Sequence, residues 1–205
     1  MTHTLNRRGL SESRPGEEII FLAMVQQKAK PHKTEAMRAM AETVLKYKPD
    51  NIIGAPLGLT NQEVIEKCIG AGIVTAVFSN QNDVVKLLED IKSRRFGISV
   101  VLSGLFSDVQ KICEETGLTP HTYNISLGIF GRTERLPDEK TLDITTQCGH
   151  ALISPHLVNH IVQRMKKGKM TSAEGAKMLV KPCVCGIGNP NRFENILDQL
   201  VTVDS

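Results

Sequence analysis

Tryptophan is absent from this sequence of 205 residues, and other aromatic residues are few, with six Phe and two Tyr. Proteins that bind single-stranded nucleic acids stack the bases on aromatic side chains, so this shortage argues against that class. Charge is nearly balanced, because 25 Lys and Arg residues stand against 22 Asp and Glu, a formal net charge of +3. A nucleic-acid surface needs a much stronger basic excess. We therefore expect no nucleic-acid partner.

Long apolar runs are also missing. No run approaches the roughly 20 residues that a membrane-spanning helix needs. Residues 1–8 lack the apolar stretch of a secretory signal peptide. These absences predict a cytoplasmic protein with no membrane partner. In that reducing compartment we expect the five cysteines to be thiols or metal ligands rather than disulfides, and their odd number agrees.

Short apolar runs alternate with amphipathic segments from residue 17 to residue 130. Runs typical of strands occupy residues 19–25, 51–55, 73–78, 97–102 and 123–130. The segments between them follow the 3.6-residue helical period and predict helices at 34–48, from 60 to near Gly70 or Gly72, at 82–94 and at 106–116. Such alternation is typical of parallel βαβ units. We therefore predict an α/β fold: a three-layer, flavodoxin-like or Rossmann-like parallel sheet of about five strands, with helices on both faces.

The sequence changes character after Gly131. Ser154-Pro155, the capping box Thr171-Ser-Ala-Glu174 and Asn189-Pro190 are helix starts, and they predict helices at 154–167, 171–180 and 189–201. We expect an N-terminal arm (1–16), an α/β domain (17–139) and a C-terminal helical segment (140–205) that carries the Cys and His loops. The arm contains two adjacent arginines, Arg7 and Arg8. It is either frayed, or folded over the active-site edge or a neighbouring subunit.

Ligands of parallel α/β sheets bind beyond the carboxyl ends of the strands. The first such loop, residues 26–33, has neither GxGxxG nor a Walker lysine motif, which disfavours NAD, FAD and P-loop nucleotide sites. Other loops at that edge offer backbone N–H groups at Ser103 and Gly104. Arg132 and Arg135 supply charge-assisted hydrogen bonds. We expect these four residues to bind a small anionic substrate.

Three of the cysteines lie in glycine-flanked loops. Cys148 occurs in Thr-Thr-Gln-Cys-Gly-His150, and Cys183 and Cys185 occur in Lys-Pro-Cys-Val-Cys-Gly-Ile-Gly-Asn-Pro190. Glycine allows the backbone to approach a ligand closely, and the helix start at Asn189-Pro190 favours a thiolate nearby. By contrast, Cys68 and Cys113 lie within predicted helices among apolar neighbours, where a cysteine acts as a small packing residue.

Three interpretations of these loops stay open. In the first, Cys148, Cys183 and Cys185 bind an iron–sulfur cluster with one open iron, which suits Lewis-acid chemistry. In the second, His150 completes a Cys₃His zinc site, although the spacing differs from that of zinc ribbons. In the third no metal binds, and either the cysteines only pack or Cys148 is a nucleophile with His150 as its base. We predict that the three cysteines converge in space.

The remaining histidines are weaker candidates. His156 and His160 share one face of a predicted helix but lack an HExxH pattern, and a solvated face explains them equally well. His32 and His121 lie near sheet loops, where each is a candidate general base. Together these features predict a cytoplasmic small-molecule enzyme of the lyase or hydratase type, with a homo-oligomer as one option for its assembly. The alternative is a non-catalytic binding or regulatory protein with a structural zinc.

Overall fold

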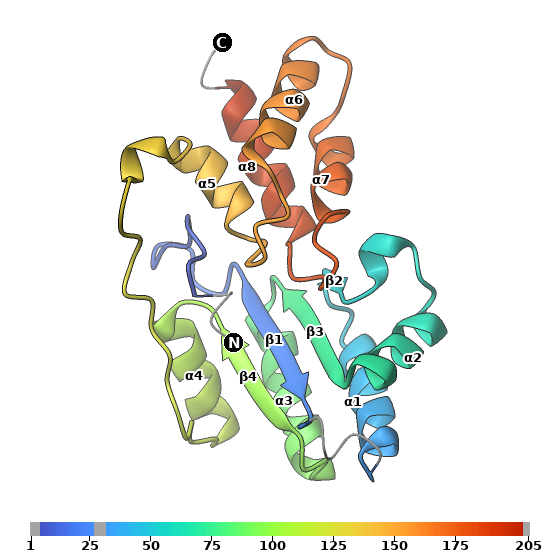
Figure 1. Ribbon diagram of the computed structural model, residues 1–205. Coiled ribbons are helices and arrows are strands. Elements are labelled where there is room, and N and C mark those ends of the chain that lie inside the picture. Colours follow the sequence, from blue (N-terminus) through green and yellow to red (C-terminus); the bar gives the residue numbers. More distant parts are fainter. Residues whose placement is uncertain (1–4, 27–31, 203–205) are drawn as a thin grey trace. The chain divides into compact units, whose positions relative to one another are not determined.

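The computed structural model describes residues 5–26 and 32–202 of the chain (Figure 1). Their contacts form two compact units. The sheet unit comprises Ser11–His121 with Val184–Ile187, and the helical unit comprises the segment ending at Leu10 with Thr122–Cys183 and the residues from Gly188 onward. The chain therefore passes between the units four times.

The sheet unit alternates strands and helices as the sequence predicts. Its elements are β1 (Ile19–Met24), α1 (Thr34–Lys46), β2 (Asn51–Ile52), the short 3₁₀ helix η3 (Ala55–Leu57), α2 (Asn61–Ala71), β3 (Ile73–Phe78), α3 (Gln81–Arg94), β4 (Ser99–Ser103) and α4 (Phe106–Thr116). The predicted capping box opens α2, because Thr60 Oγ1 accepts the Glu63 N–H while the Glu63 carboxylate accepts the Thr60 N–H.

The sheet is antiparallel, so the predicted parallel sheet of flavodoxin-like or Rossmann-like type is wrong. Four strands lie in the order β2-β3-β1-β4, and β1 is antiparallel to both β3 and β4. Since β2 is also antiparallel to β3, β1 and β2 run the same way with β3 between them. This is the split βαβ arrangement of ferredoxin-like folds. Strands and helices alternate along the sequence both in parallel α/β sheets and in the split βαβ arrangement. The two folds differ in which strands are neighbours in the sheet, and the alternation does not show this.

The predicted fifth strand is absent from the described sheet. Residues 123–130 have no regular secondary structure and belong to no described strand, and the large hydrophobic residues Tyr123, Ile125, Leu127 and Phe130 are exposed. Apolar alternation in the sequence therefore did not predict a strand here, because strand formation depends on tertiary contacts that the alternation does not show. The segment groups with the helical unit.

The hydrophobic core of the sheet unit lies on one face of the sheet. Ile19, Phe21 and Ala23 of β1 point into it beside residues of β3, and the buried residues of α1, α2, α3 and α4 pack against them. Figure 1 shows α1 and α3 on the far side of the sheet. The expectation of helices on both faces is therefore wrong for this unit.

The opposite face of the sheet also carries buried residues, including Ile20 and Leu22. On this face Thr75 Oγ1 donates a hydrogen bond of 2.5 Å to the carbonyl of Cys185, which places the stretch Val184–Ile187 against β3. Strands buried on both faces have continuous apolar sequences whether they are parallel or not, which explains the misleading signal.

Five helical elements form the helical unit: η4 (Thr133–Arg135), α5 (Glu139–Thr145), α6 (Pro155–Lys166), α7 (Ser172–Val180) and α8 (Pro190–Thr202). The predictions of α6, α7 and α8 are confirmed, with Ser154 and the box Thr171–Glu174 capping the first two. Helix α5, which spans only seven residues, was not predicted. Within the described residues, we find no helix with the length and apolar character to cross a membrane.

Candidate functional site

The thiols of Cys148 and Cys183 are hydrogen-bonded to each other within the helical unit. Both side chains are buried, with 2% and 0% exposure. Cys148 follows α5, and Cys183 follows α7. We call these two residues the thiol pair. The structure thus brings together two cysteines that are far apart in the sequence.

Backbone N–H groups surround the sulfurs of the thiol pair. The N–H groups of His150 and Leu152 bond to Cys148, and the Gly188 N–H donates to Cys183 Sγ over 3.2 Å. The hydrogen bond with Cys183 and then burial raise the pKa of Cys148, whereas the two backbone donors lower it. Two thiolates in contact repel each other, so one sulfur keeps its proton unless a cation binds.

A buried amide network fixes the loop that carries Cys148. Gln147 is fully buried, and its Oε1 accepts the Asn189 N–H over 3.0 Å. Asn189 in turn caps α8, since its Oδ1 accepts the N–H groups of Asn191 and Arg192. Ala151 has a φ of +56°, a conformation that L-residues rarely adopt. The loop is therefore held in one conformation at the start of α8.

Residues 5–10 of the N-terminal arm lie on the same part of the helical unit. Arg7 Nη2 donates to the carbonyl of Gln147 over 2.5 Å, and the Arg8 N–H donates to Thr146 Oγ1 over 3.0 Å. The buried Arg192 guanidinium donates to the Arg8 carbonyl. Residues 5–10 are thus bound beside the cysteine loop rather than frayed, whereas residues 11–16 group with the sheet unit. The sequence allowed for a folded arm but indicated no partner for its arginines.

The other predicted cysteines and His150 have different surroundings. Cys185 lies in the stretch that groups with the sheet unit, and it is partly exposed. His150 is exposed, and its backbone N–H is what bonds to Cys148. Burial raises the pKa of the Cys68 thiol to about 12, in agreement with a packing role, and Cys113 is half-buried in α4.

The four predicted substrate-binding residues are divided between the units. Ser103 is the last residue of β4 in the sheet unit and Gly104 follows it, while Arg132 and Arg135 are exposed residues of the helical unit. Their predicted grouping required a parallel sheet. In the antiparallel sheet the loops after β3 and β4 open at one end and those after β1 and β2 at the other. Within the loop 26–33, residues 27–31 lie outside the described part of the chain.

The remaining histidines lie on the surface. His156 and His160 are exposed on α6, and His32 and His121 are exposed as well. Across residues 5–26 and 32–202, no group of three or more His, Cys, Asp or Glu side chains is arranged to hold a metal ion. The geometry of the described residues therefore assembles two thiols rather than a complete ligand set.

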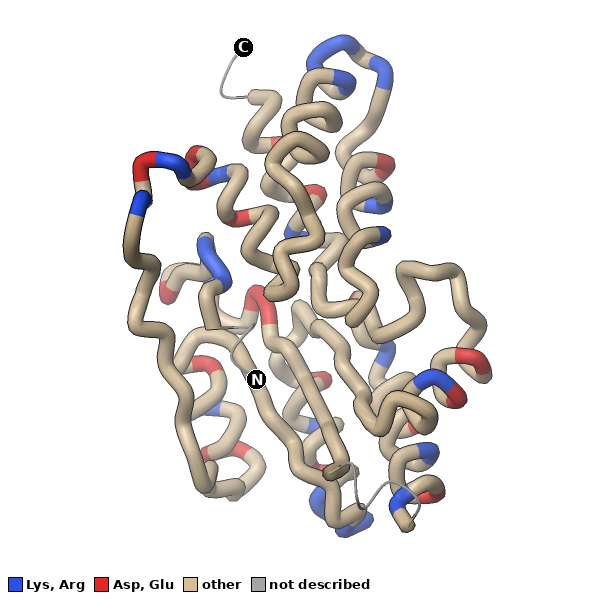
Figure 2. The backbone as a smooth tube through the Cα atoms, in the orientation of Figure 1, with Lys and Arg blue, Asp and Glu red and all other residues tan. Residues whose placement is uncertain are grey.

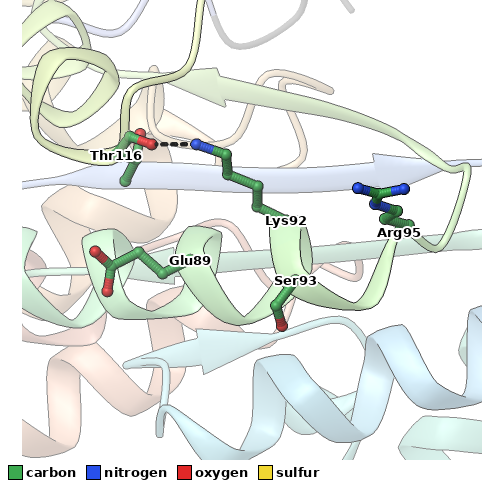
Figure 3. A pocket seen from close by; sticks show the side chains of 5 residues that line it. All are labelled: Glu89, Lys92, Ser93, Arg95 and Thr116. Carbon is green, nitrogen blue, oxygen red and sulfur yellow. Dashed lines mark hydrogen bonds between the residues drawn. The ribbon is translucent and has the colours of Figure 1, made fainter.

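An open depression of about 490 Å³ lies in the sheet unit, lined by Glu89, Lys92, Ser93, Arg95 and Thr116 (Figure 3). Lys92 Nζ donates to the Thr116 carbonyl over 2.9 Å at the end of α4. A lysine in this position satisfies a helix C-terminus. The ammonium group of Lys92 therefore caps α4. The residues that line the depression include neither cysteine nor histidine.

No protein-family model matches this chain, and no curated protein or solved structure does either. The function must therefore be inferred from the geometry of the thiol pair.

Proposed function

We propose that this protein is a cytoplasmic small-molecule enzyme in which Cys148 and Cys183 are thiolate ligands of an iron–sulfur centre. The observation that carries the proposal is a pair of buried sulfurs in contact, each with backbone N–H donors. Iron–sulfur clusters are held by cysteine thiolates, and hydrogen bonds to the sulfurs tune them. The donor set of the pair fits such a group.

Electrostatics favour a cation at the thiol pair. Two buried thiolates in contact destabilise each other, and the raised pKa of Cys148 follows from its contact with Cys183 and from burial. A soft cation between the sulfurs removes that repulsion, because it binds both in the thiolate form. The N–H donors already present offset part of the remaining negative charge.

The third ligand is proposed from sequence spacing alone. Cys185 follows Cys183 by two residues, and a three-cysteine cluster leaves one iron open for Lewis-acid chemistry on an anionic substrate. This chemistry is typical of lyases and hydratases. The predicted substrate contacts Ser103, Gly104, Arg132 and Arg135 are not part of this proposal, because their grouping required a parallel sheet. The alternative is a structural zinc, with His150 as a fourth ligand.

Metal analysis tests the proposal. We expect protein purified without oxygen to contain iron and acid-labile sulfide, and the Cys148→Ser and Cys183→Ser variants to lose both. Cys113→Ser is the matched control, because Cys113 belongs to α4 of the sheet unit and is not one of the proposed ligands, and this variant should keep its metal. A colourless protein with one zinc supports the alternative. Metal-free protein in which Cys148 and Cys183 form a disulfide contradicts both metal proposals.

A further inference from the structure

Two successive backbone amides hold the two cysteine loops side by side. The Gly188 N–H donates to Cys183 Sγ over 3.2 Å, and the next amide, that of Asn189, donates to Gln147 Oε1 over 3.0 Å. Gln147 directly precedes Cys148 in the sequence. These two bonds bring the loops together independently of the contact between the thiols. All five residues belong to the helical unit, so the arrangement lies within one compact unit.

The sulfurs of the thiol pair are in direct contact, because a hydrogen bond joins the two buried side chains. A disulfide requires sulfurs about 2.05 Å apart. Thiols that are already in hydrogen-bond contact reach that separation by a small rotation of their side chains. The pair is therefore able to form a disulfide without a rearrangement of its loops. In reducing compartments such disulfides are transient, and they serve catalysis or redox sensing.

Neither cysteine loop contains a residue of fixed charge. Residues 144–154 and 182–191 include no Lys, Arg, Asp or Glu, and the tube is tan through both stretches (Figure 2). The loops therefore offer no cationic side chain of their own to hold both sulfurs as thiolates when no metal is bound. A disulfide is neutral, so its formation removes the repulsion between the sulfurs without a cation.

We propose that the thiol pair is a redox switch, in which hydrogen peroxide converts Cys148 and Cys183 of the metal-free protein to a disulfide that a dithiol reduces again. One sulfur, as the thiolate, attacks a peroxide oxygen and the O–O bond breaks, which leaves a sulfenic acid and a hydroxide. That hydroxide takes up the proton lost by the attacking thiol. The second sulfur then attacks the first, the S–O bond breaks, and the second thiol proton leaves with the hydroxyl group as water. The sulfurs lose two electrons, and the peroxide becomes two molecules of water.

The disulfide has two consequences for the helical unit. It occupies both sulfurs, so metal binding and the disulfide exclude each other; this regulatory role rests on the proposed function, whereas the oxidation itself does not. It also closes a covalent loop over residues 149–182, which include α6 and α7. A closed loop lowers the entropy of the unfolded chain. Oxidised protein should therefore melt at a temperature about 10 °C higher than reduced, metal-free protein.

Thiol counting and peptide mass spectrometry test the switch on full-length protein that is first reduced and treated with a chelator without oxygen. We expect an equimolar amount of hydrogen peroxide to consume two of the five thiols, to link the peptides of Cys148 and Cys183, and dithiothreitol to restore both thiols. Cys113→Ser, altered in α4 of the sheet unit, is the matched control and should form the same link. A protein that keeps all five thiols, or that links other cysteines, overturns the proposal.

Serine variants of the pair test the intermediate. In Cys148→Ser and in Cys183→Ser no link forms, and the remaining cysteine of the pair should accumulate sulfenic acid, which dimedone traps. The wild-type result stands even if these variants do not fold. Metal analysis of protein purified without oxygen judges the proposed function separately. An iron protein that forms no link once its metal is removed refutes the switch alone, and a metal-free protein that forms the link only with peroxide supports the switch while it contradicts the metal.

Discussion

Gly186 is a residue where the backbone leaves no room for a side chain. A Cβ there would lie 2.1 Å from the carbonyl carbon of Ile52, and the φ of +66° already disfavours any L-residue. Backbone atoms cannot move aside as a flexible side chain can. We predict that Gly186→Ala lowers the free energy of unfolding by about 3 kcal/mol, from the combined cost of overpacking and of a left-handed alanine. Urea denaturation measures this change.

Gly58 provides the control for this substitution. Its φ is +76°, but a Cβ added there would have no atom within 4 Å, so Gly58→Ala tests the backbone cost alone, about 1 kcal/mol. Equal losses in the two variants would mean that the close approach to Ile52 is unimportant.

Asp90 links three side chains on the surface of the sheet unit. Its carboxylate accepts hydrogen bonds from Lys46 Nζ at 2.9 Å, Tyr47 Oη at 3.2 Å and Arg94 Nε at 2.7 Å. The bond from Lys46, followed by those from Arg94 and Tyr47, holds the pKa of Asp90 below its ordinary value. A lowered pKa means that the folded state favours the ionised carboxylate.

The pH dependence of Asp90→Asn follows from that sign. The stabilisation is complete above the unfolded pKa, about 3.9, and disappears as the pH falls through the lower folded value. We therefore expect the variant to be less stable than wild type by about 0.5–1 kcal/mol at pH 7, with the difference vanishing in acid. Thermal melts at several pH values check this. A difference that grew in acid would refute the assignment.

At the scale of elements, α7 depends on its capping box. Thr171 Oγ1 accepts the Glu174 N–H at 3.2 Å, and the Glu174 carboxylate accepts the Thr171 N–H at 2.8 Å. We predict that Thr171→Ala lowers the free energy of unfolding by about 1 kcal/mol, because the Glu174 N–H loses its acceptor and the reciprocal bond is weakened. Thr119→Ala, at an exposed loop position, should change it little. Chemical denaturation of both variants decides.

Local chemistry made most helices predictable. Caps at Thr60, Ser154 and Thr171 mark helix starts in the sequence, and each is present in the structure. The exception, α5, is capped by Asp138, but it is too short for a periodic pattern to stand out. Strand pairing was not predictable, because apolar strands buried on both faces have the same composition in parallel and antiparallel sheets.

The thiol pair was partly predictable, because local sequence marked its cysteines. Glycine-flanked cysteines in loops pointed to Cys148 and Cys183, whereas the network that holds them did not show in the sequence. Gln147 and Asn189 are buried polar residues, and sequence alone does not show which amides will be paired in the interior. The sequence therefore identified the two cysteines but not the buried hydrogen-bond network that holds their loops in place.

For the whole molecule, we predict that loss of the arm changes amide hydrogen exchange in the helical unit but not in the sheet unit. Removing residues 1–10 deletes the hydrogen bonds of Arg7 and Arg8 to the cysteine loop and the bond from Arg192. We expect amides of α5 and of the first turn of α8 to exchange about tenfold faster, since each lost hydrogen bond is worth about 1 kcal/mol. Amides of β1 and β3 belong to the sheet unit and serve as the internal control. Uniform acceleration in both units would contradict this prediction.

The four passages of the chain between units have a consequence for biosynthesis. The arm leaves the ribosome before residues 11–121 and waits for a binding surface that begins at Thr122. At about 5–20 residues per second, that wait is on the order of ten seconds. The nascent sheet unit has a wait of its own, because Val184–Ile187, which bind over Thr75, are translated long after β3. The pace of translation between codons 122 and 187 thus sets how long a nascent, incomplete sheet stays within reach of chaperones and proteases.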